Sequence, residues 1–165
     1  SLQVLGIRYA DSRVPESVAT AYKSEDIFDH DTSHSTLPPC YLRHGPSELT
    51  VSPCTIRLSY AITAFGVQHV LVVGHTHCGG AAACMSVART PSPSLAADTP
   101  LGRWLAPLTS IASSILEKTS NAPLDALVEE NVRAQVANLS GAPAMQDAWE
   151  GGKTMSWIHE LGYKI

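Results

Sequence analysis

The sequence has few charged residues and no cluster of basic ones. Charged side chains make up 16% of the 165 residues, and the formal net charge is −4. Electrostatic binding to nucleic acid requires clustered Lys and Arg that neutralise phosphates, so we expect no nucleic-acid partner. No apolar run approaches the ~20 residues of a membrane-spanning helix, and the first residues do not resemble a signal peptide. We therefore expect a soluble protein without a membrane partner, and a cytoplasmic location is favoured.

Cysteine is also scarce. Four cysteines are too few for a disulfide scaffold in a chain of this size, although Cys40 and Cys54 flank a proline-rich loop and could pair in an oxidising compartment.

A hydrophobic fraction of 44% excludes a disordered chain, and the length is that of one ordinary domain. We predict a single domain over residues 1–165.

Two apolar runs have the character of buried strands. Residues 2–7 form a short β-prone run, and residues 69–73 form a continuous run rich in Val that is typical of a central parallel strand. Between them, residues 29–53 predict a long loop with many prolines, and residues 56–65 predict a mostly buried helix. A helix is also expected to begin at residues 14–21, with a proline in its first turn.

The second half of the chain is predominantly helical in pattern. Residues 81–88 and 104–118 predict helices, as do residues 124–139, with a final strand over residues 154–158. The helix over 124–139 has an inner stripe at helical spacing, which comprises Leu127, Val128, Asn131, Val132, Gln135 and Leu139. The alternation of strands and helices predicts an α/β fold with a central, mostly parallel β-sheet flanked by helices.

Polar residues follow both strong strands at the point where each strand ends. Tyr9, Asp11 and Arg13 follow the first, and His75 and Cys78 follow the second. Since parallel strands carry ligands at their carboxyl ends, adjacent strands would bring the two clusters together. A His and a Cys three positions apart can reach one tetrahedral Zn²⁺ across a tight turn. The spacing also occurs by chance with both side chains simply packed in the core, but the carboxylate and guanidinium nearby favour a metal site.

These segments resemble the β-class carbonic anhydrases. Residues 10–16 (Ala-Asp-Ser-Arg-Val-Pro-Glu) are similar to the family's first metal-site motif, and residues 74–81 (Gly-His-Thr-His-Cys-Gly-Gly-Ala) are similar to the second. The similarity covers most of the chain and extends to residues 59–62, 65–73, 104–105, 130–132, 138–139 and 149–153.

The resemblance implies a zinc lyase, carbonate dehydratase, that interconverts CO₂ and bicarbonate. His75 and Cys78 would be zinc ligands, while Asp11 would either ligate zinc or pair with Arg13, and Asp11 and Arg13 would be the catalytic residues. Hydroxide generated on the zinc at neutral pH would attack CO₂.

The sequence departs from the family pattern in places that matter for this activity. Tyr9 occupies the position of a cysteine ligand, and a phenol is a poorer zinc ligand than a thiolate. The segment after Phe28 differs from the family's, and the family's N-terminal helical arm is not present in the sequence. Two alternatives therefore stay open: a degenerate, non-catalytic homologue with weak or no zinc binding, and a hydrolase of a CO₂-like molecule such as CS₂ or COS.

Two further expectations concern assembly and the other histidines. The helix over 56–65 and the final strand carry more apolar surface than one small sheet can cover, so we expect a homodimer or a higher homo-oligomer. The remaining histidines are expected not to be ligands, and most of them are expected to be surface or loop residues. His77, inside the motif, could shuttle protons. These histidines are His30, His34, His44, His69, His77 and His159.

Overall fold

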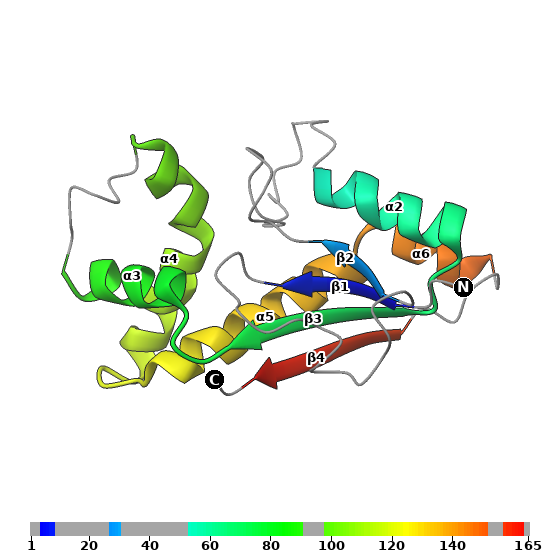
Figure 1. Ribbon diagram of the computed structural model, residues 1–165. Helices are drawn as coiled ribbons and strands as arrows, with labels where there is room; N and C mark the ends of the chain where they lie inside the picture. Colours follow the sequence, from blue (N-terminus) through cyan, green and yellow to red (C-terminus); the bar gives the residue numbers. More distant parts are fainter. Residues whose placement is uncertain (1–3, 9–26, 31–52, 91–97, 152–156, 164–165) are drawn as a thin grey trace.

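The computed structural model describes residues 4–8, 27–30, 53–90, 98–151 and 157–163 (Figure 1). These residues form four strands and five helices, in the order β1 (Val4–Arg8), β2 (Ile27–His30), α2 (Pro53–Phe65), β3 (His69–His75), α3 (Gly79–Arg89), α4 (Pro100–Lys118), α5 (Leu124–Ser140), α6 (Pro143–Glu150) and β4 (Trp157–Tyr163). No helix in these ranges is long and apolar enough to span a membrane.

The described strands form one parallel sheet in the order β2-β1-β3-β4. In its centre, Val4 of β1 pairs with His69 of β3, and Arg8 pairs with Val73. Because β1 and β3 are adjacent and parallel, their carboxyl ends meet at the same edge of the sheet. The prediction of a parallel sheet flanked by helices is confirmed, as are strands at the start of the chain and after residue 68.

Helices α2, α5 and α6 cover one face of this sheet. Val70 and Val72 of β3 project from that face into a hydrophobic cluster shared by the three helices; its largest helical members are Leu58, Ile62, Val132, Leu139 and Met145. Leu71 and Val73 alternate with them and pack with Val4 in a separate cluster. A strand that is buried on both faces needs apolar side chains on both, so its sequence does not alternate between apolar and polar residues. This explains the continuous apolar run of β3.

Helices α3 and α4 lie beyond the carboxyl edge of the sheet (Figure 1). They pack against each other and against the first half of α5, in a cluster that includes Cys84, Leu105, Leu108, Leu127 and Val128. Helix α5 therefore belongs to two clusters, one under the sheet and one beyond its edge. The turn between β3 and α3 connects the cluster under the sheet to the cluster beyond its edge.

Two short elements were not predicted. Residues 29–53 were expected to form a loop, but Asp29 and His30 belong to β2, a four-residue strand at the edge of the described sheet. Four residues that include one Asp and one His are too few to show a strand period. Helix α6 was missed because its eight residues begin at Pro143, two positions after Gly141, so that the start of the segment has the composition of a turn.

Other boundaries moved. Helix α4 starts at Pro100 rather than near residue 104, because Thr99 caps it by accepting a hydrogen bond from the Gly102 amide at 3.0 Å. Strand β4 runs to Tyr163, five residues past its expected end; its expected start, like the helix expected at residues 14–21, lies outside the described residues.

The prediction that the helix over 56–65 is mostly buried was wrong. Helix α2 buries Leu58, Ala61 and Ile62, whereas Ile56 and Tyr60 are 55% and 53% exposed. Apolar composition alone did not reveal that only one side of this helix meets the sheet cluster.

Candidate metal centre

The turn between β3 and α3 carries the two predicted metal ligands. His75 is the last residue of β3 and Cys78 is the N-cap of α3, and their side chains are 3% and 2% exposed. Between them, His77 is exposed and has a φ of 56°, in the left-handed region that non-glycine residues rarely adopt. This backbone reversal helps the turn to close within two residues, with His75 and Cys78 both buried.

A hydrogen bond fixes the chemistry of the His75 ring. Its Nδ1 lies 2.8 Å from the Thr76 carbonyl oxygen. A carbonyl can only accept, so Nδ1 carries the proton and donates it, which places the lone pair of the neutral ring on Nε2. A neutral imidazole held in one tautomer by a backbone carbonyl is the usual state of a histidine that binds a metal ion.

Cys78 lies where a helix favours negative charge. Its Sγ accepts a hydrogen bond from the Ala81 amide at 3.5 Å, so the sulfur caps the start of α3. The partial positive charge of a helix N-terminus stabilises a thiolate, and the thiolate is the form that binds metal. An imidazole nitrogen and a thiolate sulfur, both buried, form a donor pair that fits Zn²⁺.

The remaining predicted site residues follow β1. Tyr9, Asp11 and Arg13 come directly after this strand in the sequence but lie outside the described residues. Arg8, the last described residue before this segment, pairs with Val73, two residues before His75. Within the described ranges, no group of three or more His, Cys, Asp or Glu side chains is placed to hold a metal ion. The roles of Asp11 and Arg13 stay predictions.

The other histidines follow the expectation only in part. His77 is exposed in the turn, as expected. His30, His69 and His159 lie in strands, and His69 is half-buried at the start of the strand that the sequence predicted. His34 and His44 lie outside the described residues.

One buried polar residue received no role from the sequence. Asn131 of α5 is fully buried, and its Oδ1 accepts a hydrogen bond from Gln135 Nε2 at 3.2 Å. The available signal was an amide side chain within the apolar inner stripe of that helix, because a buried polar group must find hydrogen-bond partners.

Comparison with known proteins identifies the family. The sequence model of the carbonic anhydrase family matches residues 4–165. A carbonic anhydrase of Pseudomonas aeruginosa is 31% identical over 167 residues, covering 96% of this chain and 69% of the relative. A carbonic anhydrase of Synechococcus elongatus is 28% identical over 166 residues, covering 96% of this chain but only 57% of the relative. The chain belongs to the carbonic anhydrase family, a family of enzymes.

Solved structures identify the class of fold. The β-carbonic anhydrase CafA of Aspergillus fumigatus superposes with a TM-score of 0.71 at 24% identity, covering 98% of this chain and 70% of that chain. A structure described as a tetrameric β-carbonic anhydrase, from Sordaria macrospora, gives 0.67 at 23% identity, covering 96% of this chain and 75% of that chain. The fold is that of the β class.

Proposed function

We propose that this chain carries the active site of a zinc-dependent carbonic anhydrase that hydrates CO₂ reversibly to bicarbonate. The observation that supports this most directly is the turn after β3. It buries a histidine in the metal-binding tautomer and a cysteine at a helix N-terminus, three positions apart. The names of the relatives in the same family support the reaction.

In this proposal, His75 through Nε2, the Cys78 thiolate and Asp11 would hold the zinc. Zinc bound in this way would lower the pKa of a water molecule and so provide a nucleophile for CO₂ near neutral pH. If Arg13 instead held Asp11, the Asp11 carboxylate would be free to accept a hydrogen bond and would orient the nucleophile. The ligand role and the orienting role of Asp11 compete.

Tyr9 favours a second candidate, a homologue with weak or no zinc binding. A complete structural zinc site contributes roughly 10–16 kcal/mol, so losing one thiolate should weaken binding by several kcal/mol and leave the site empty at low zinc. A third possibility, a zinc hydrolase of CS₂ or COS, requires the same site. These linear molecules are so similar to CO₂ that only direct assays distinguish the substrates.

We also propose that the protein is a homo-oligomer. Ile56 and Tyr60 form an exposed apolar face on α2, and the Phe65 ring contacts the Tyr60 ring edge-on with centroids 5.0 Å apart. The Sordaria macrospora relative is described as tetrameric.

The test is zinc content per subunit together with CO₂ hydration, measured with and without added Zn²⁺. We expect one zinc per chain in the wild type and loss of both zinc and turnover in His75→Ala and Cys78→Ser. Cys84→Ala is the matched control, because it removes a buried thiol from α3 outside the turn and should keep the zinc. A wild type that binds no zinc would refute the proposal, and zinc binding with turnover only of CS₂ or COS would favour the third candidate.

A further inference from the structure

Two buried polar side chains occur among the residues whose burial is described, His75 and Asn131. A carboxamide enclosed by apolar side chains destabilises a protein unless its hydrogen bonds are made. In Asn131 the oxygen accepts from Gln135, which orients the side chain and leaves its NH₂ group to act as a donor elsewhere. The position of Asn131 in the fold indicates which acceptor this NH₂ group can reach.

The packing of α5 shows where Asn131 lies along β3. One turn before it, Leu127 and Val128 pack in the cluster that contains Cys78. The residue after it, Val132, packs in the cluster that contains Val72. Asn131 is therefore level with the part of the chain between Val72 and Cys78, and α5 packs against both β3 and α3.

Strand β3 has no side chain in the corresponding position. Val70 and Val72 project toward α5, and by the alternation of a strand the next residue on that side is Gly74. A glycine on the side of the strand that faces α5 leaves room for a helix side chain to approach the strand backbone closely. The residue after Gly74 is His75, the first candidate ligand.

We infer that Asn131 is a positioning residue for the metal centre. Its carboxamide, aligned by Gln135, hydrogen-bonds the backbone at the end of β3 and holds the turn over 74–78 in the shape that brings His75 and Cys78 together. Asn131 itself does not touch the metal. The importance of this turn rests on the proposed function, but the geometric role of Asn131 does not.

The test compares two thiols of the metal-free protein. Cys78 lies in the turn and Cys84 lies one and a half turns into α3, and both are buried. Mass spectrometry of peptides measures how fast iodoacetamide alkylates each thiol. The rate at Cys78 reports how often the turn opens, and the rate at Cys84 reports how often helix α3 opens. Asn131→Leu should raise the Cys78 rate about tenfold, the effect of one lost backbone hydrogen bond, and leave the Cys84 rate within about twofold.

Equal rates in wild type and variant, or rates that rise together at both thiols, would overturn the inference, because a purely structural role predicts no preference for the turn. If Asn131→Leu does not fold, Gln135→Leu keeps the carboxamide and removes only its orienting bond. It should then show the same preference for Cys78 with a smaller rise, and no preference would again contradict the inference.

A titration with Co²⁺ separates this inference from the proposed function. The thiolate-to-cobalt absorption should appear in the wild type and require about tenfold more Co²⁺ in Asn131→Leu. A wild type without this absorption would refute the proposed metal site, while the ratio of the thiol rates would still decide the role of Asn131. Equal Co²⁺ affinity in both proteins would count against the inference.

Discussion

Cys78 and Cys84 have opposite hydrogen-bonding roles although both are buried. Cys78 accepts from a backbone amide at the start of α3, whereas the Cys84 thiol donates to the Leu105 carbonyl oxygen at 3.9 Å. Burial raises the pKa of the Cys84 thiol, an effect that a hydrogen bond with the Thr109 side chain partly offsets. Cys84 is thus held as a neutral thiol in the core, and Cys78 is the cysteine suited to bind a metal.

The raised pKa of Cys84 predicts a loss of stability at alkaline pH. In the unfolded chain the thiol ionises near its ordinary pKa of 9.0, below its pKa in the folded protein. Between these two pKa values the folded state binds more protons than the unfolded state. The contribution of Cys84 to the free energy of unfolding is therefore fully present below about pH 9 and is lost as the pH rises through the pKa of the folded state. In Cys84→Ala the free energy of unfolding, measured by urea titration from pH 8 to 11, should fall less steeply. Parallel curves for the two proteins would contradict this.

Tyr9→Cys should strengthen the proposed zinc site. A thiolate in this position would complete a set of two cysteines and one histidine with Zn–S distances of ~2.3 Å, and would free Asp11 to pair with Arg13. Zinc affinity and CO₂ hydration should rise together, measured by competition with a chelator and by stopped flow. Equal values for both proteins would show that the site already works with Asp11, and tight binding without turnover would direct attention to the segment after Phe28.

The end of α2 requires a glycine, and the end of α5 does not. Gly66 has a φ of 62° and terminates α2, with its amide bonded to the Ile62 carbonyl oxygen at 3.2 Å. Gly141 follows α5 at a φ of −84°, where an added Cβ would meet only ordinary contacts. Gly66→Ala should therefore lower the free energy of unfolding by about 1 kcal/mol, whereas Gly141→Ala should be neutral or slightly stabilising. Equal effects in thermal unfolding would contradict this assignment.

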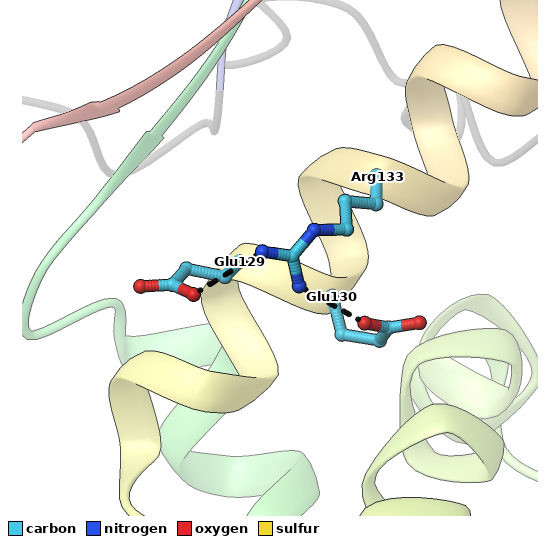
Figure 2. Close-up of polar contacts among 3 residues, drawn as sticks. All are labelled: Glu129, Glu130 and Arg133. Atoms are coloured by element: carbon cyan, nitrogen blue, oxygen red, sulfur yellow. Dashed lines mark hydrogen bonds and ion pairs between the residues drawn. The ribbon is translucent and has the colours of Figure 1, made fainter.

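Arg133 on α5 bridges two acidic residues of the same helix (Figure 2). Its guanidinium lies 3.5 Å from Glu129 and 3.3 Å from Glu130, and all three side chains are more than half exposed. Exposed pairs of this spacing contribute little because water and salt screen them. Arg133→Ala should lower the free energy of unfolding by less than about 0.5 kcal/mol in urea titration. A larger loss would indicate that this face of α5 is covered in the assembled protein.

The elements that the sequence predicted are those with a long, uniform pattern. The apolar run of β3 is continuous, and the helical spacing along α5 extends over several turns. Helix α3 could be predicted because it follows a glycine-bearing loop after a strand. Strand β2 and helix α6 were missed because their identity depends on pairing and packing with distant residues rather than on their own composition. For the site, the spacing of His75 and Cys78 predicted a metal centre only together with the polar cluster after β1 and the family resemblance. Helical spacing placed Asn131 on the inner side of α5, but its position along β3 required the packing of α5 in both clusters.

The exposed face of α2 predicts how the subunits associate. Replacing both Ile56 and Tyr60 by Lys should weaken an interface formed there through charge repulsion and loss of apolar burial. We expect sedimentation at micromolar concentration to show an oligomer for the wild type and a shift toward monomer for the double variant. The same change at exposed Leu101 of α4 is the control, and it should leave the assembly unchanged. A wild-type monomer would refute the prediction.

The two candidate ligands belong to different packed units of the molecule. His75 ends a strand of the sheet, whereas Cys78 packs in the cluster of α3 and α4 beyond its edge. A metal ion bound by both residues would cross-link the two units, and its binding free energy would add to the stability of the contact between them. Without metal, this contact should open before the sheet does. Metal removal should therefore uncouple the melting of the α3–α4 unit from that of the rest of the protein.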